Sequence, residues 1–326
     1  MKTIALFFGG PSNEHEVSIV SAKNIYKNIE RNKFNIKLVY WDKNRLFYLV
    51  KDFSKLKTNR KRLQIENFKK NFDIAFPITH GKYGEDGVLQ SIFESQKIRY
   101  CGCRVLSSAL CMDKAIFKDL ISAHKINQVN YVVLDYILET KKEINSKLIE
   151  IKCTFNFPLF VKPANSGSSV GITRVEKMTE LKRAIAIALI HDNKVLIEEG
   201  LVAPREIEVA VLGNNEVFVS QAGELKLAKD FYDYEDKYKL NKTEFIIPAK
   251  ISDRQSDEIK RLSKKVYQIC ACSGFARIDF FIANNKIYLN ELNTLPGFTN
   301  ISMYPMLMEK SGVKYLELIE KIINLA

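Results

Sequence analysis

Three oxygen-bearing side chains lie close together near the end of the sequence. Asp279 occurs in one alternating segment, and Glu291 and Asn293 occur in the next, across the turn 284–285. This pattern predicts two antiparallel strands with Asp279 beside Glu291 and Asn293. Carboxylate and amide oxygens suit a hard cation such as Mg²⁺, which usually keeps phosphate oxygens of a substrate in its shell. On its own, the hairpin fits an ordinary salt bridge between Arg277 and Glu291 better.

A loop of small residues could bind the phosphates that such a cation accompanies. Residues 165–169 join strand-like runs at 158–163 and 170–175. Small flexible residues let backbone N–H groups approach phosphate oxygens, and serine hydroxyls can donate too. Lys114 and Lys162 could place positive charge nearby. A polar loop of this kind is, by itself, more often a plain hairpin turn.

A candidate purine-binding segment follows this loop in the sequence. The run 195–201 is typical of a strand entering a linker, and a linker between domains can hold a base between apolar walls. Glu206 lies on the next predicted strand, 205–209, where a surface carboxylate is the simplest role. The hairpin, the loop and the linker are therefore informative together rather than singly.

The elements that must position these residues form three blocks. The first opens with a strand, a glycine turn and a helix, which starts a βαβ unit and predicts a small parallel α/β domain. Its predicted strands are 3–8, 35–40 and 72–77, and its predicted helices are 16–29 and 88–95. The central block begins with a helix from Ser107 through 112–114 and contains a charged insertion or helix at 140–152. The expected domains are 1–102, 103–200 and 201–326.

Composition is that of a globular chain. The sequence has 326 residues and a formal charge of +12, much of it within 51–70. Such charge suits a solvated surface or acidic, phosphate-bearing substrates, and no nucleic-acid-binding motif accompanies it. The six cysteines form no CxxC pair and the four histidines are scattered, so no zinc site is predicted. With no signal peptide and no run of roughly 20 apolar residues, we expect a cytoplasmic protein.

Taken together, these motifs resemble the D-alanine–D-alanine ligases of the ATP-grasp superfamily, over nearly the whole chain and in the family's order. The matching pieces are 9–18, 80–87, 112–114, 162–171, 231–238, 276–279 and 290–302. The resemblance implies an α/β, three-domain ATP-grasp architecture, in which an N-terminal parallel α/β domain precedes two α+β domains that clasp ATP. It also implies a homodimer.

The implied reaction joins two D-alanines for peptidoglycan precursors of the cell wall. ATP phosphorylates the carboxylate of one D-alanine, and the amine of the second attacks the acyl phosphate to give D-alanyl-D-alanine and phosphate. Two Mg²⁺ ions, or Mn²⁺, would neutralise the transferring phosphate. The resemblance assigns Asp279 and Glu291 to one ion, and Glu291 and Asn293 to the other.

The resemblance also assigns a binding set for ATP. Adenine would lie between the second and third blocks, its edge facing Glu198 and the backbone of Glu199 and Leu201, while Glu206 would bind the ribose hydroxyls. The phosphates would lie under the loop 167–169. The implied phosphate-binding residues are Lys114, Lys162, Ser168, Ser169 and Lys237.

The two D-alanines acquire partners in the same way. Glu14 would accept the ammonium of the first D-alanine. Arg277 and the backbone N–H of Gly297 would face the oxyanion of the tetrahedral intermediate. Ser302 and the backbone of Met303 would bind the carboxylate of the second D-alanine.

A hydrogen-bonded set is implied to lock a mobile loop, 231–238, over the site. The set joins Tyr238 and Ser168 to Glu14, and Lys237 in the same loop would cover the γ-phosphate or the acceptor carboxylate. His80, from the matching motif 80–87, completes the implied catalytic residues.

The chain departs from the family pattern at a few positions. The contact of Ser166 is open, because some members place a charged residue near it. Glu199 stands where a lysine is common, which leaves only its backbone role. The basic segment 51–70 matches no motif.

Two alternatives stay open from the sequence. A relative that makes D-alanyl-D-lactate, or another carboxylate–amine product, would share the metal and phosphate residues. A basic nucleic-acid binder is the alternative outside enzymes, and it would show salt-dependent binding without phosphate release.

Overall fold

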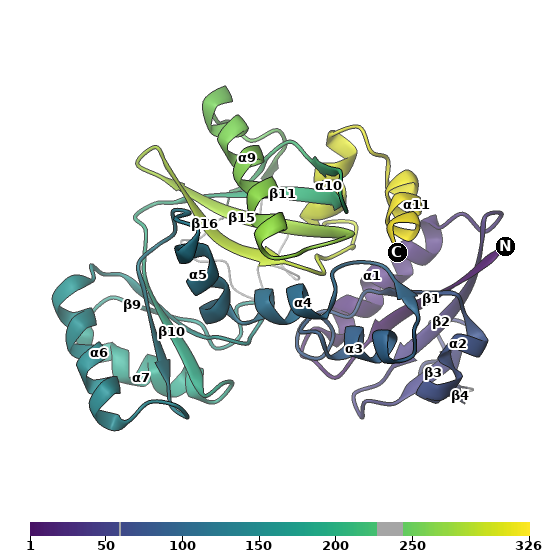
Figure 1. The fold of residues 1–326 in the computed structure, drawn as a ribbon, viewed down its shortest axis with the longest axis horizontal. Coiled ribbons are helices and arrows are strands. Elements are labelled where there is room, and N and C mark those ends of the chain that lie inside the picture. The colour runs from purple at the N-terminus through teal and green to yellow at the C-terminus, as the bar shows by residue number, and fades with distance from the viewer. Residues whose placement is uncertain (59, 227–243) are drawn as a thin grey trace.

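The computed structural model describes residues 1–58, 60–226 and 244–326, and three sheets follow one another along these residues (Figure 1). The first sheet and its helices form the purple-to-blue unit, the second sheet the teal unit, and the third sheet the green-to-yellow unit. Among the described residues, no helix is long and apolar enough to cross a membrane.

The first sheet has the order β4-β3-β2-β1-β5-β6. Its parallel strands are β1 (Lys2–Gly9), β2 (Phe34–Trp41), β5 (Ile74–Pro77) and β6 (Arg99–Tyr100). Its antiparallel edge is β3 (Phe47–Val50) and β4 (Lys61–Arg62). The accompanying helices are α1 (His15–Asn28), η1 (Ile65–Asn67), α2 (Phe68–Asn71) and α3 (Val88–Ser95). The expected parallel strands are present, but the antiparallel edge was not predicted.

The second sheet is antiparallel, with the order β7-β10-β8-β9. Its strands are β7 (Tyr131–Asp135), β8 (Leu159–Pro163), β9 (Thr173–Val175) and β10 (Lys194–Glu199), and its helices are α6 (Lys141–Thr154) and α7 (Met178–Leu189). The charged segment predicted as an insertion or a helix is α6. It begins where Thr140 and Glu143 form a capping box, which satisfies backbone N–H groups at the helix start.

The prediction of one helix from Ser107 through Lys114 is wrong, because this segment belongs to two helices. α4 (Val105–Met112) ends at Asp113, and α5 (Lys114–Ala123) begins there. Asp113 has extended backbone, and its carboxylate accepts hydrogen bonds from the N–H groups of Ala115 and Ile116. An aspartate cap of this kind stabilises a new helix start and turns the chain between the first and second units.

The third sheet has the order β14-β13-β11-β15-β16, and β12 pairs with β11. Its strands are β11 (Arg205–Gly213), β12 (Val217–Val219), β13 (Gly223–Lys226), β14 (Glu244–Ile246), β15 (Phe275–Ala283) and β16 (Lys286–Asn293). Its helices are α9 (Asp253–Ile269), α10 (Met303–Lys310) and α11 (Tyr315–Leu325).

The first and third units share one hydrophobic core, which includes α1, α10 and α11. In Figure 1, α11 lies beside α1. Asn24 Nδ2 on α1 donates to the carbonyl of Phe298 at 2.9 Å and to the hydroxyl of Tyr315 at 2.8 Å. These contacts hold the segment after β16 against the first unit.

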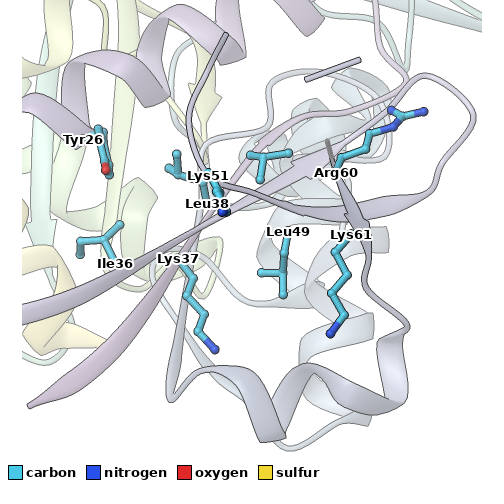
Figure 2. A pocket seen from close by; sticks show the side chains of 9 residues that line it. Tyr26, Ile36, Lys37, Leu38, Leu49, Lys51, Arg60 and Lys61 are labelled. Carbon is cyan, nitrogen blue, oxygen red and sulfur yellow. The ribbon is translucent and has the colours of Figure 1, made fainter. Parts of the chain in front are cut away.

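The basic segment contributes to a separate groove on the first unit (Figure 2). This cavity of about 610 Å³ is lined by Tyr26, Ile36, Lys37, Leu38, Leu49, Val50, Lys51, Arg60 and Lys61. Arg60 stacks over the Tyr48 ring at 3.9 Å and lies 3.6 Å from Asp42. The groove shares no lining residue with the larger cavity described below.

Candidate active site

A cavity of about 780 Å³ collects residues from all three units. Every candidate site residue that the structure describes lines it: Glu14, His80, Lys114, Lys162, Ser168, Ser169, Glu198, Glu199, Leu201, Glu206, Arg277, Asp279, Glu291, Asn293, Gly297, Ser302 and Met303. Lys237, Tyr238 and the loop 231–238 lie outside the described residues.

The predicted hairpin is present with the predicted register. Asp279 on β15 pairs with Glu291 on β16, and Arg277 pairs with Asn293. The register shifts directly after Asp279, and such irregularities commonly re-aim side chains near active sites. Asn293 Nδ2 donates to Asp279 Oδ2 at 2.9 Å. The oxygen ligands therefore lie side by side and face the cavity.

Arg277 does not form the salt bridge with Glu291 that the sequence left open. Its guanidinium donates to both carboxylate oxygens of Asp279, at 2.8 and 2.7 Å, and its Nε lies 3.0 Å from Glu208 Oε2. Burial opposes its charge, but Asp279 and Glu208 outweigh burial and hold the pKa of Arg277 above its usual range. Glu208 was missed, although it shares a strand face with Glu206 and lies opposite Asp279 in the register.

The donor set fits a hard divalent cation. Asp279, Glu291 and Asn293 supply carboxylate and amide oxygens toward the cavity, with Lys114 Nζ 3.9 Å from Glu291 Oε2. Within the part of the chain that the structure describes, no three His, Cys, Asp or Glu side chains are already gathered at metal-binding geometry.

Glu14 lies where the first unit meets the glycine-rich loop. The hydroxyl of Ser168 donates to Glu14 Oε1, as expected for the loop-locking set. Two glycines make room for this carboxylate: a Cβ at Gly81 would lie 2.6 Å from Glu14 Oε2, and one at Gly167 would lie 3.0 Å from it. Glu14 is 8% exposed and lines the cavity, so its carboxylate is held in the cavity wall.

A second carboxylate, Glu85, lies beside Glu14 and had been given no role from the sequence. A Cβ at Gly167 would lie 3.9 Å from Glu85 Oε1. Burial, together with the charge of Glu14, raises the pKa of Glu85 to about 8. Two neighbouring carboxylates in a poorly solvated site cannot both ionise freely. The only signal in the sequence was the motif 80–87 itself.

His80 lines the cavity, but both ring nitrogens have partners. Its Nδ1 lies 3.0 Å from the carbonyl of Leu295, and its Nε2 lies 3.1 Å from Ser21 Oγ. A carbonyl only accepts, so Nδ1 carries the proton and Nε2 accepts from Ser21. Burial lowers the pKa of His80. The neutral imidazole thus links α1 to the segment after β16.

The phosphate-binding candidates lie at the junction of α5 with the glycine-rich loop. Lys114 Nζ donates to the carbonyl of Ser166 at 2.7 Å, and Ser166 Oγ donates to the carbonyl of Val170 at 3.1 Å. Asp113 binds Lys194 Nζ at 2.8 Å and accepts from Asn165 Nδ2 at 3.3 Å. The open contact of Ser166 is therefore within its own loop.

The predicted adenine edge is built on β10 and the linker after it. Glu198 is 4% exposed and forms an ion pair with Lys162 and another with Lys118, whose Nζ lies 2.8 Å from Glu198 Oε1. Burial alone would raise the pKa of Glu198, but the two lysines lower it to about 2. The side chain of Glu199 accepts instead from Asn130 and Asn156, which fits a backbone role at that position.

The oxyanion and acceptor candidates lie at the start of α10. A Cβ at Gly297 would lie 2.7 Å from Ser302 Oγ. Ser302 occupies the N-cap position of α10, but its hydroxyl accepts from the N–H of Thr299 at 2.9 Å instead of capping the helix. A helix N-terminus offers backbone N–H groups to an anion, which suits a substrate carboxylate.

Comparisons with known proteins agree with this arrangement. The protein-family model described as D-ala D-ala ligase N-terminus matches residues 3–103 of the sequence. The family model described as D-ala D-ala ligase C-terminus matches residues 120–324. The D-alanine–D-alanine ligase of Caldicellulosiruptor bescii is 44% identical, over 99% of this chain and 94% of its own. D-alanine–D-alanine ligase B of Clostridium tetani is 44% identical, over 99% of this chain and 93% of its own.

Solved structures give the same result. The VanG D-Ala:D-Ser ligase from Enterococcus faecalis superposes with a TM-score of 0.89 at 35% identity, covering 99% of each chain. The D-alanine–D-alanine ligase from Coxiella burnetii superposes with a TM-score of 0.84 at 31% identity, covering 100% of this chain and 95% of its own. The ATP-grasp architecture expected from the sequence is thereby confirmed. The chain belongs to the D-alanine–D-alanine ligase family.

Proposed function

We propose that this chain ligates two D-alanines to D-alanyl-D-alanine with ATP, for peptidoglycan precursor synthesis. Family membership over nearly the full chain supports the activity. The main structural support is the hydrogen bond from Ser168 to Glu14, because it joins the phosphate loop to the carboxylate that would receive the substrate ammonium.

The reaction balances in two steps. A carboxylate oxygen of the first D-alanine attacks the γ-phosphorus of ATP, and ADP leaves. The ammonium of the second D-alanine loses one proton to solvent, and the free amine attacks the acyl carbon. The C–O bond to phosphate then breaks, inorganic phosphate leaves, and the nitrogen loses a second proton to solvent to give the amide. Glu14 binds the first ammonium, Arg277 and the N–H of Gly297 stabilise the oxyanion, and Ser302 with the N–H of Met303 binds the acceptor carboxylate.

Mg²⁺ is the proposed cofactor, with two ions held by Asp279, Glu291 and Asn293. When bound, the metal supplies charge neutralisation for the transferring phosphate. Since Arg277 and Asn293 now bind Asp279, its carboxylate would exchange these donors for the cation. Lys114 and Lys162 bind the phosphates with Ser168 and Ser169.

The adenosine part occupies the linker after β10. Glu198 and the backbone of Glu199 and Leu201 meet adenine, and Glu206 binds the ribose. Lys237 and Tyr238 keep their proposed roles in closing the site. The proposed domains are 1–102, 103–200 and 201–326, each centred on one sheet, in a cytoplasmic homodimer.

The function is tested by phosphate release from ATP with D-alanine, compared with L-alanine, D-lactate and D-serine. D-Serine is included because one structural neighbour is a D-Ala:D-Ser ligase. We expect release that depends on D-alanine, with D-alanyl-D-alanine as the product by mass spectrometry. Preferential D-alanyl-D-lactate or D-alanyl-D-serine formation would change the acceptor, and release without any ligation product would refute the proposal.

A further inference from the structure

Lys118 is the one lysine that is almost completely buried among the residues that the structure describes, with 2% exposed. It lies on α5 one helical turn after Lys114 and does not line the active-site cavity. Its Nζ lies 2.8 Å from Glu198 Oε1 and donates to Gln128 Oε1 at 3.4 Å. Lys118 can therefore affect a bound nucleotide through its ion pair with Glu198, but not by direct contact.

The surroundings of Lys118 fix its side chain. Gln128 Nε2 donates to the carbonyl of Lys118 and to Ser122 Oγ, both at 2.8 Å. The Lys118 ammonium lies 5.3 Å from the ring centroid of Tyr131, and the Tyr131 hydroxyl donates to Asp119 at 2.6 Å. The ammonium is thus held between α5 and β7 rather than being free to swing.

Lys162 differs from Lys118 in its access to the cavity. It pairs with the other carboxylate oxygen, Glu198 Oε2, but it is 13% exposed and lines the cavity. If Lys162 turns to a phosphate, Glu198 loses one of its two counter-charges. A buried carboxylate left with no counter-charge is strongly unfavourable. Lys162 can therefore leave Glu198 only while Lys118 remains as the other counter-charge.

We propose that Lys118 is a positioning residue that keeps Glu198 charged and oriented from behind, so that Lys162 can move from Glu198 to the nucleotide phosphates. The inference rests on the proposed function, in which Lys162 binds phosphate and Glu198 meets adenine. When Lys162 leaves, Oε2 becomes the acceptor for the exocyclic amino group of adenine, while Lys118 keeps Oε1. An ionised carboxylate only accepts hydrogen bonds, so it selects an amino group over the oxygen of a 6-oxopurine.

The first test replaces Lys118 with the uncharged, similarly long methionine. Without Lys118, Lys162 must stay on Glu198, so we expect the KM for ATP and the Kd for ADP to rise by roughly 10- to 100-fold, as for loss of a charged partner at a binding site. The KM for D-alanine should change less than about twofold and the preference for ATP over ITP should fall. Lys118→Arg, which keeps the charge, should retain most ADP binding.

The decisive test adds a second substitution, Glu198→Gln. In Lys118→Met/Glu198→Gln no buried carboxylate is left to hold Lys162, so binding of inorganic tripolyphosphate should return to within about threefold of wild type. The preference for ATP over ITP should stay lost, because the ionised acceptor is gone. A purely structural role for Lys118 would not produce this separation of phosphate binding from base selection.

The same binding titrations include a control variant. Lys125→Met, an exposed lysine just beyond α5, should bind ADP and tripolyphosphate like wild type. If Lys118→Met does not fold, a folded double variant that binds tripolyphosphate still supports the inference. An unchanged KM for ATP in Lys118→Met, or a double variant that binds tripolyphosphate no better than Lys118→Met, overturns it. Failure of wild type to ligate D-alanine would instead refute the proposed function, and the titrations would still test Lys118.

Discussion

At the scale of single residues, Glu14 leaves no room for a side chain at Gly81. Gly81 has a φ of +73°, and a Cβ there would lie 2.6 Å from Glu14 Oε2. Any side chain at this position must therefore displace the carboxylate proposed to bind the first ammonium.

We predict that Gly81→Ala raises the KM for D-alanine by roughly 10-fold or more, because the displaced Glu14 carboxylate pairs less well with the substrate ammonium. A tenfold rise corresponds to about 1.4 kcal/mol of lost binding free energy. The KM for ATP should change little. Gly312→Ala is the matched control, because Gly312 has a φ of +94° and nothing within 4 Å of its Cβ position. Both variants carry similar backbone strain. The KM values come from steady-state kinetics. If Gly312→Ala raised the KM for D-alanine as much as Gly81→Ala does, the contact with Glu14 would not be the cause.

A second prediction concerns Glu85, whose pKa rises from 4.5 to about 8 in the folded chain. Above pH 4.5 the unfolded chain has released this proton while the folded chain still holds it, so stability falls as pH rises from about 4.5 to about 8. Glu85→Gln removes this penalty, and its Tm should fall less than that of wild type between pH 5 and 8 in ligand-free protein. The exposed control Glu309→Gln should follow wild type; parallel curves for Glu85→Gln and wild type would contradict the shift.

The sequence predicted the residues that face the cavity better than those that support them. Asp279, Glu291 and Asn293 share one hairpin, so local periodicity was enough to place them. Glu208 and Lys118 matter because distant segments bring them against Arg277 and Glu198. Such pairings depend on sheet order and burial, which alternation along one segment does not reveal.

At the scale of elements, the break between α4 and α5 positions the phosphate lysine Lys114. Asp113 caps α5 and also holds Lys194 and Asn165. The sequence predicted one helix from Ser107 through Lys114, with no break at Asp113. An aspartate inside a helical pattern signals a cap only when the chain turns.

We predict that Asp113→Ala lowers the free energy of unfolding by about 1–2 kcal/mol, the usual cost of losing an N-cap, and also raises the KM for ATP. Urea denaturation and steady-state kinetics measure the two effects. Ser252→Ala removes the cap of α9, far from the phosphate lysines in the chain, and should cost similar stability without changing the KM for ATP. An Asp113→Ala enzyme with a normal KM would mean that the cap serves folding alone.

At the scale of the whole molecule, the predicted block order matches the order of the three sheets. The shared core of the first and third units was not predicted, since it joins α1 to α10 and α11 at the far end of the chain. This packing matters for the site, because it brings Glu14 and His80 to the hairpin that carries Asp279 and Glu291. Periodicity within each block cannot reveal contacts between blocks.

Ligation through an acyl phosphate is tested most directly by the origin of one oxygen atom in the released phosphate. D-Alanine labelled with ¹⁸O in both carboxylate oxygens is supplied with unlabelled ATP and Mg²⁺, and the inorganic phosphate is analysed by mass spectrometry. Because the carboxylate oxygen that attacks the γ-phosphorus leaves with phosphate, we predict one ¹⁸O in each phosphate and one D-alanyl-D-alanine for each phosphate released. Unlabelled phosphate, which hydrolysis of ATP by water would give, would contradict an acyl-phosphate intermediate.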